Sequence, residues 1–261
     1  MVWIPFWSKK EEAKPSAPAS DIAAKCPVDH SKFTKKSQGP AKCPVDHDVL
    51  DPTTNMPYNL SATNKVPGQK LDLPTERTLS SIPRGDEESA GVWEYPSPQQ
   101  MLNAIVRKGH IDTPEADVPA MVDVHNFLNE GAWSEILKWE KKYMDESGQE
   151  PRLLKFTGRP NEPSPRARML QLMGSIYPSK YGGPPPFDRH DWTVLRYNMA
   201  GEKKEVRYVI DYYAGPSEDG FPTFFLDVRP ALDSFESVRD RSELWSKSVW
   251  EKALGQGGRQ E

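Results

Sequence analysis

The sequence predicts an α+β fold in which several helices surround a small antiparallel sheet, after a long, irregular, proline-rich N-terminal segment. Eleven of the 26 prolines precede residue 93. Apolar residues recur at helical spacing between residues 97 and 144, and three segments rich in β-branched and aromatic residues follow between residues 192 and 228. We therefore divide the chain into a largely disordered region, residues 1–92, and a catalytic domain, residues 93–261.

The N-terminal region contains an exact repeat. Ala-Lys-Cys-Pro-Val-Asp-His occupies residues 24–30 and again residues 41–47. The proline in each copy disfavours helical backbone at the cysteine before it. The rest of the region is rich in Pro, Ser, Thr and Asn, which predicts an extended linker along the domain surface.

Capping signals define the first helix of the folded domain. Ser97 is a good N-cap, Pro98 suits the first helical position, and Gly109 ends the apolar run. A second helix is expected to begin near Pro119, and a third to run from about Ala132 to Met144.

Strands are expected in the second half of the domain. A short helix over residues 166–173 precedes segments 192–197, 205–213 and 223–228, which are separated by glycine-containing turns. This pattern is typical of a three-stranded antiparallel meander. Apolar positions then mark a long final helix: Leu232, Phe235, Val238, Trp245 and Val249.

Composition excludes several function classes. No apolar window is long enough to span a bilayer, and a pI near 5.8 without basic runs argues against nucleic-acid binding. The net charge of −4 resides in residues 93–261. Met1–Trp7 is too short and proline-broken for a cleaved signal and lacks the pattern of a transit peptide, so no cleaved presequence is evident. Its two tryptophans suit either a bilayer interface or a merely sticky terminus.

Cys26 and Cys43 supply the soft ligands of the repeat. A thiolate or imidazole of this kind suits haem iron or zinc, but the closely spaced cysteine pair of a zinc finger is missing. Haem binding, zinc binding and a docking repeat without metal remain open on this pattern.

His125 falls on the predicted apolar stripe of the second helix, with Met121, Val124 and Leu128. A histidine there is by default a hydrogen-bonded core residue, yet an imidazole in an apolar groove is also what a haem pocket requires. The aromatic residues available as pocket walls, or simply as core, are Trp93, Tyr95, Trp133 and Trp139.

His190 lies among charged residues at the entrance to the first predicted strand. Arg189 or Arg196 could bind haem propionates there, although a salt-bridged loop explains the pattern equally well. His110 follows a helix-ending glycine and is expected to be a solvated cation.

Seven ordered runs of residues are similar to the mitochondrial cytochrome c haem lyases, the holocytochrome c-type synthases. They are Trp93–Ser97, Val124–Asn126 with Asn129–Glu130 and Ala132–Trp133, Glu135–Glu140, Ser164–Arg168, Pro186–Trp192, Glu205–Tyr213 and Leu226–Ser234. The Cys-Pro repeats also resemble the family's haem regulatory motifs. Two features depart from the family: His110 stands where an aromatic residue is expected, and both Cys-Pro elements end in Asp-His.

The resemblance implies that haem b, in the ferrous state, is a substrate. It implies that His125 is an axial ligand of the iron, and that Glu130, in the catalytic site with it, and Asn126 support the pocket from the same helix. Trp93, Tyr95 and Trp133 then contact haem. His190, Arg189 and Arg196 are implied to contact propionates or pocket walls, and Cys26 and Cys43 to be auxiliary ligands outside the catalytic core.

The implied reaction adds two cysteine thiols across the haem vinyl groups, forming thioethers on the Cys-x-x-Cys-His segment of apocytochrome c, with apocytochrome c1 as a second candidate partner. The acidic folded domain would attract a basic apocytochrome helix. The implied location is peripheral, on the intermembrane-space face of the inner mitochondrial membrane. The alternatives are a non-enzymatic haem sensor or chaperone and, third, a zinc-held adaptor.

Overall fold

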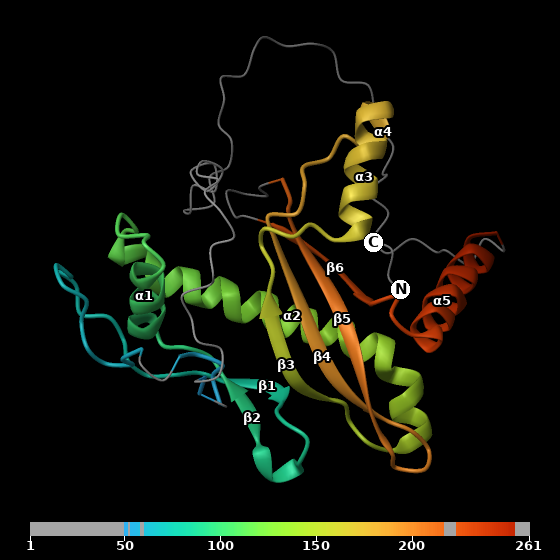
Figure 1. The fold of residues 1–261 in the computed structure, drawn as a ribbon, viewed down its shortest axis with the longest axis horizontal. Helices are drawn as coiled ribbons and strands as arrows, with labels where there is room; N and C mark the ends of the chain where they lie inside the picture. Colours follow the sequence, from blue (N-terminus) through green and yellow to red (C-terminus); the bar gives the residue numbers. More distant parts are fainter. Residues whose placement is uncertain (1–49, 52, 58–59, 217–222, 254–261) are drawn as a thin grey trace.

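A four-stranded antiparallel sheet crossed by one long helix forms the centre of the molecule (Figure 1). The computed structural model describes residues 50–253, apart from residue 52, residues 58–59 and residues 217–222. The strand order is β3 (Arg152–Gly158), β4 (Asp188–Tyr197), β5 (Lys203–Ala214) and β6 (Phe224–Pro230). The α+β class predicted from the sequence is confirmed.

The sheet has one strand more than predicted. Strand β3 was missed because its apolar alternation is broken: the pairing with β4 shifts register between Leu153 and Lys155. The other three strands lie where their β-branched and aromatic residues predicted them, with two to four additional residues at the start of β4 and the end of β6. In β4 and β5, Trp192 pairs with Tyr208, and both side chains are buried on the same face.

Helix α2 (Val118–Ser147) covers that face as a single helix. The sequence predicted two helices here, with a break close to Gly131. The helix instead continues through Gly131, where it packs closely on the sheet. A Cβ at this position would lie 3.2 Å from Cδ1 of Leu226 on β6, so a residue without a side chain fits best. Gly131 therefore lets helix and sheet approach closely, which offsets its poor helix propensity.

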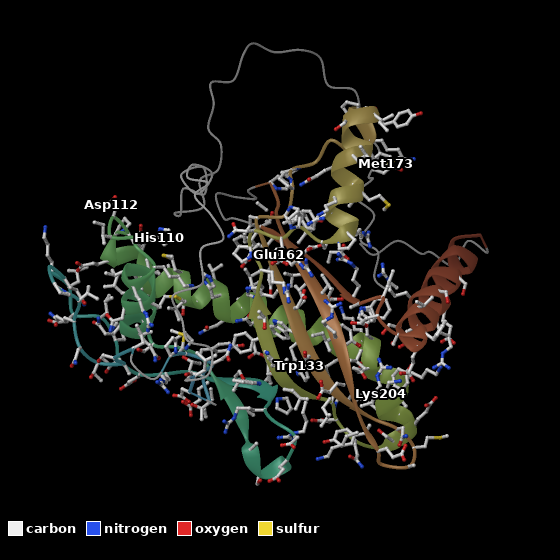
Figure 2. All side chains as sticks on the ribbon, in the orientation of Figure 1. His110, Asp112, Trp133, Glu162, Met173 and Lys204 are labelled. Carbon is white, nitrogen blue, oxygen red and sulfur yellow. The ribbon has the colours of Figure 1, made fainter. Side chains whose placement is uncertain are left out.

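The core fills the layer between α2 and the sheet. Residues from both elements, with two from the segment before α1, contribute to it. Its largest members are Trp93, Trp133, Ile136, Trp139, Leu153, Trp192, Tyr208, Ile210 and Tyr212. Figure 2 shows Trp133 between α2 and the sheet.

A small hairpin is attached to the edge of the sheet. Strand β1 (Leu79–Pro83) pairs with β2 (Val92–Glu94), and a 3-10 turn, η2 (Glu88–Ala90), lies between them. Trp93 donates a hydrogen bond from Nε1 to the Leu153 carbonyl at 3.0 Å. The described part of the predicted linker thus contributes a strand, and the boundary expected at residue 93 falls inside a hairpin.

Helix α1 (Pro98–Arg107) follows the hairpin and has the predicted cap: the amide of Gln100 donates to Oγ of Ser97 at 3.2 Å. A short 3-10 turn, η3 (Glu115–Asp117), leads into α2.

The remaining helices lie outside the two central layers (Figure 1). Helices α3 (Pro165–Ile176) and α4 (Pro178–Tyr181) connect β3 to β4, and α5 (Phe235–Ala253) follows β6. Among the described residues, no helix combines the length and apolarity needed to cross a bilayer.

A buried ion pair joins the C-terminal half of α2 to β4. Glu140 is 1 % exposed and accepts hydrogen bonds from Nε and Nη2 of Arg196 at 2.8 and 2.9 Å, and another from the hydroxyl of Tyr208. The Arg196 guanidinium also stacks 3.5 Å from the ring centroid of Tyr143 and pairs with Asp240 at 3.2 Å. Burial alone would lower the pKa of Arg196, but these partners raise it.

Breaking this pair from one side should be costly. Glu140→Leu leaves the Arg196 guanidinium buried without its main partner, so we expect a loss of about 3 to 5 kcal/mol in the free energy of unfolding. The measurement is urea unfolding of the full chain followed by circular dichroism. As a control, the double variant Glu140→Leu/Arg196→Met removes both charges and should be clearly more stable than the single variant. Equal unfolding midpoints for the two variants would contradict this prediction.

Candidate functional site

His125 projects from the N-terminal half of α2 and is exposed, not part of the buried stripe predicted from the sequence. The buried positions of the helix are instead Val118, Val122, Leu128, Ala132, Trp133, Ile136, Trp139, Glu140 and Tyr143. Because the helix has 3.6 residues per turn, these buried positions form a stripe that runs beside His125 and does not include it.

The imidazole of His125 is held by its own helix. Nδ1 lies 2.6 Å from the carbonyl oxygen of Met121, one turn earlier. Because a carbonyl only accepts hydrogen bonds, Nδ1 carries the proton and Nε2 is left with a free lone pair. Metal-binding histidines commonly have this arrangement, with one nitrogen donating to a backbone carbonyl and the other facing the metal.

The start of β4 provides a second histidine, His190, next to Asp188, a carboxyl that also interacts electrostatically with His125. Nε2 of His190 lies 3.1 Å from Oδ2 of Asp188, and Nδ1 lies 3.4 Å from the hydroxyl of Tyr212. Both ring nitrogens of His190 therefore have partners, whereas Nε2 of His125 has no hydrogen-bond partner among the described residues. Of the two, His125 is the better placed to coordinate a metal.

Electrostatics link the two histidines through Asp188. Burial raises the pKa of this carboxyl, but hydrogen bonds from the His190 ring and the Arg189 amide, with Coulomb interactions from His190 and His125, outweigh it. The net effect places the pKa of Asp188 below its ordinary value. His125 thus interacts electrostatically with the start of β4.

Aromatic rings line the same end of the sheet. Phe187 lies 6.2 Å from Tyr212 and 6.0 Å from Phe224, measured between ring centroids, and His190 meets Tyr212 edge to face at 5.1 Å. Val124, Leu226, Phe187 and Phe224 are partly buried side chains that pack against the core, to which Tyr212 belongs. Partly buried aromatic and aliphatic side chains thus lie at the end of the core that Val124, the residue before His125, also covers, and apolar side chains near an imidazole suit a large flat ligand with a metal at its centre.

Glu130 is bound to the hairpin. Its carboxylate accepts hydrogen bonds from the hydroxyl of Tyr95 at 2.9 Å, from the amide of Ser81 at 3.0 Å and from the Ser81 hydroxyl. Burial and the neighbouring carboxylate raise the pKa of Tyr95. Glu130 therefore joins α2 to β1 and to the segment after β2, and Asn126 lies half-buried one turn before it.

The other predicted residues do not converge on His125. Trp93 and Trp133 are core residues, and Arg196 is buried at the opposite end of the sheet with Glu140. Arg189 lies on the sheet face away from α2, where it binds Asp191 through two nitrogens at 2.9 and 3.1 Å.

Cys26 and Cys43 lie outside the described residues. Within the described part of the chain, no group of three or more His, Cys, Asp or Glu side chains forms a metal site.

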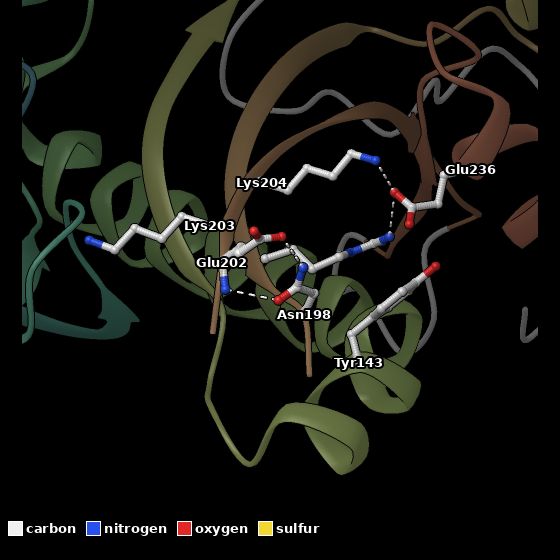
Figure 3. A pocket seen from close by; sticks show the side chains of 7 residues that line it. Tyr143, Asn198, Glu202, Lys203, Lys204 and Glu236 are labelled. Atoms are coloured by element: carbon white, nitrogen blue, oxygen red, sulfur yellow. Dashed lines mark hydrogen bonds and ion pairs between the residues drawn. The ribbon is translucent and has the colours of Figure 1, made fainter. Parts of the chain in front are cut away.

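A small polar cavity of about 240 Å³ lies at the far end of the sheet (Figure 3). Its lining side chains are largely paired with one another: Lys204 and Arg196 contact Glu236, and Asn198 bonds Glu202. Because of this pairing and its distance in the fold from His125, the cavity adds nothing to the candidate site.

Sequence reasoning missed four members of the site: Phe187, Asp188, Tyr212 and Phe224. Strand alternation was the available signal, since Asp188 and His190 are two residues apart and therefore share a face. The sequence offered no comparable signal for the pairing of Asp188 with Tyr212, which depends on strand register.

Comparison with known proteins gives a consistent family. The sequence profile described as cytochrome c/c1 heme lyase matches residues 6–245. The chain is 48% identical to holocytochrome-c synthase of Saccharomyces cerevisiae over 250 residues, which is 90% of this chain and 92% of that protein.

More distant relatives carry similar names. The chain is 42% identical to human holocytochrome c-type synthase over 75% of this chain and 68% of that protein. It is 43% identical to a putative holocytochrome-c1 synthase of Schizosaccharomyces pombe over 61% of this chain and 69% of that protein. No solved structure matches.

The lowered pKa of Asp188 predicts a pH dependence of stability. A carboxyl whose pKa is lower in the folded state contributes stability above its unfolded pKa, near 3.9, and loses it as the pH falls through the folded value. Asp188→Asn should therefore be less stable than the parent chain at pH 5, and the difference should shrink below about pH 3. Urea unfolding across this range measures it. A difference that stays constant with pH would contradict the assignment.

Proposed function

Because this chain belongs to the cytochrome c/c1 haem lyase family, we propose that it is a holocytochrome c synthase, a lyase that takes haem and apocytochrome c as substrates. The alignment with a holocytochrome-c synthase along nearly the full length of both chains carries this proposal. The exposed imidazole of His125 beside an aromatic wall supplies a place for the haem.

The reaction consists of two thiol additions. In each, the sulfur of a cysteine bonds to the vinyl carbon attached to the porphyrin ring, and the thiol proton is transferred to the outer vinyl carbon. The carbon–carbon double bond becomes single, no electrons are exchanged and nothing leaves. This chain contains no Cys-x-x-Cys-His segment, so the cysteines belong to the apocytochrome.

We propose that Nε2 of His125 coordinates the haem iron on one side. The bond from Nδ1 to the Met121 carbonyl fixes the tautomer that this role requires. The histidine of the apocytochrome segment takes the other side, which places each thiol next to its vinyl group.

Orientation then supplies most of the catalysis. Correct placement of reacting groups is worth roughly 7 to 11 kcal/mol in favourable cases. Phe187 and Phe224, which pack as partly buried side chains over the core, form the wall against which the porphyrin lies, and His190 with Asp188 supplies polar contacts at its edge.

Glu130 acts in this proposal as a positioning residue. Its bonds to Tyr95 and Ser81 hold the hairpin against α2, one turn beyond His125. Arg189 and Arg196 pair with acidic residues away from His125, so the proposal assigns them structural roles.

The product must leave the enzyme. His125 is exposed, and a ligand at an open position is readily displaced once the mature cytochrome offers its own second ligand to the iron. Tight binding of the product would slow turnover without helping the chemical step.

Cellular context completes the proposal. We place the chain on the intermembrane-space face of the inner mitochondrial membrane, peripherally bound, with Cys26 and Cys43 as haem-delivering ligands outside the catalytic domain. The printed names of the relatives include both c and c1 synthases, so apocytochrome c1 is a second candidate substrate.

His125→Ala tests the ligand assignment. Co-expression with apocytochrome c, read as covalent haem on a denaturing gel, should show at least a tenfold loss of product, and the purified variant should lose its Soret band. His125→Cys keeps a ligand and should retain haem with a shifted spectrum. The matched control, His110→Ala, changes another exposed histidine and should leave the product unchanged. Full product from His125→Ala would remove the claim.

The Cys-Pro repeats are tested separately. Cys26→Ser/Cys43→Ser should keep most of the activity when haem is plentiful, because the two cysteines lie outside the proposed catalytic domain. Activity should fall when haem is scarce, as measured by product yield against added haem. Complete loss of product at high haem concentration would place the repeats in the active site.

A further inference from the structure

Helices α3 and α4 form a compact unit at the end of the sheet where β4 begins. Oγ of Ser164 accepts from the Ala167 amide at 3.1 Å and donates to buried Asp211 at 2.5 Å, which anchors the start of α3 on β5. A Cβ at Gly174 would lie 2.7 Å from the carbonyl oxygen of Tyr181, so α3 and α4 pack with their backbones close together. The face of α3 with Ala167 and Gly174 is therefore the inner one.

The opposite face of α3 is apolar and exposed. At 100° per residue, Met169, Leu172 and Ile176 share one side of the helix, about 180° from Ala167 and Gly174. Their exposed fractions are 56, 65 and 59 %, and Tyr177 just beyond them is 58 % exposed. Figure 2 shows α3, with Met173 labelled, projecting beyond the sheet. We call Met169, Leu172, Ile176 and Tyr177 the α3 stripe.

An exposed stripe of this size is unusual for a surface helix. An amphipathic helix normally turns its apolar face to the core and its polar face to water. Helix α3 has small residues toward the protein and large apolar residues toward solvent. A surface that exposes several large apolar side chains together marks a place of contact with another apolar phase or partner.

The charges around the stripe favour an anionic surface. Residues 164–186 contain three basic residues and no acidic one, in a chain of net charge −4. Arg166 pairs with Asp227 at 3.3 Å, while Arg168 and Lys180 are exposed near the two ends of the stripe. Tyr177 and Tyr181 add rings that combine an apolar body with a polar tip, as is common at membrane interfaces.

We propose that the α3 stripe docks the protein onto an anionic lipid bilayer, with α3 in the plane of the interface. Apolar side chains at i, i+3 and i+7, flanked by basic residues, are the pattern of an interfacial helix. A basic polypeptide would be repelled by the same flanks, which argues for lipid as the occupant. This inference rests on the peripheral membrane attachment proposed above and names the surface that makes it; it does not depend on haem attachment.

Docking in this way would bring the bilayer close to the candidate site. Helix α4 is joined by residues 182–186 to Phe187 and Asp188, which belong to the wall and to the polar group at the start of β4. Haem is a flat, largely apolar molecule that partitions into lipid. The stripe therefore places the start of β4 where haem leaves the bilayer.

Sedimentation with vesicles tests the proposal on the full chain. Vesicles of phosphatidylcholine with about one-fifth phosphatidylglycerol should bind the protein at least tenfold more strongly than phosphatidylcholine alone, and added salt should weaken the binding. Leu172→Glu/Ile176→Glu should lose this binding by at least tenfold, and Arg168→Glu/Lys180→Glu should lose the dependence on phosphatidylglycerol. Unchanged binding by the first variant would overturn the proposal.

Matched controls separate the stripe from apolar exposure in general. Ile111→Glu and Met199→Glu alter residues that are 75 and 78 % exposed outside the stripe, and should bind vesicles as the parent chain does. Circular dichroism should show that all variants are folded. Equal losses in the controls and the stripe variants would overturn the assignment to α3.

A label on the stripe distinguishes lipid from other occupants. In a Cys26→Ser/Cys43→Ser background, Leu172→Cys carrying an environment-sensitive dye should shift to shorter emission wavelength when anionic vesicles are added. Rapid maleimide labelling of the same cysteine without lipid would agree with a free stripe. Protection from maleimide, or a dimer that Leu172→Glu dissociates, would show that the protein itself covers the stripe and would overturn the proposal. Product formation in detergent should remain unchanged in Leu172→Glu, which separates this test from that of the proposed function.

Discussion

The buried ion pair of Glu140 and Arg196 fixes how α2 lies across the sheet, and the position of His125 depends on it. From Glu140 to His125, fifteen residues of helix cover about 22 Å. From Arg196 to Asp188, eight residues of strand cover about 26 Å. Because helix and strand start from one contact and run similar lengths, His125 reaches the level of Asp188 and His190. The Glu140–Arg196 pair at one end of the layer thereby determines where His125 lies at the other end.

Local sequence signals predicted the elements whose formation is decided locally. Ser97 and Pro98 begin α1 as expected, and the β-branched segments became β4, β5 and β6. The failures lie where tertiary contacts override local preference. Gly131 stays helical because Leu226 packs against it, and β3 is irregular in pattern because its pairing shifts beside Leu153. Neither contact can be read from the residues of one element alone.

The candidate site shows the same division. The resemblance singled out His125 and His190, but neighbours in sequence did not remain neighbours in space. Arg189 is adjacent to His190, yet strand alternation sends it to the opposite face and into a pair with Asp191. Asp188 and Tyr212, by contrast, meet His190 because they share its face. At the start of β4, strand geometry therefore places the Arg189–Asp191 pair on one face and His190 with Asp188 on the other.

The hydrogen bond between the His125 ring and the Met121 carbonyl has a stereochemical consequence. The hydrogen bond at Nδ1 restricts rotation of the imidazole, so as the proposed haem ligand it would meet each porphyrin in the same orientation. The two faces of haem are mirror images of each other. Aromatic side chains on one side of a fixed His125 ring would allow only one of these faces to bind it. The configuration at the two carbon atoms that bond to sulfur would then be determined by the helical turn from Met121 to His125.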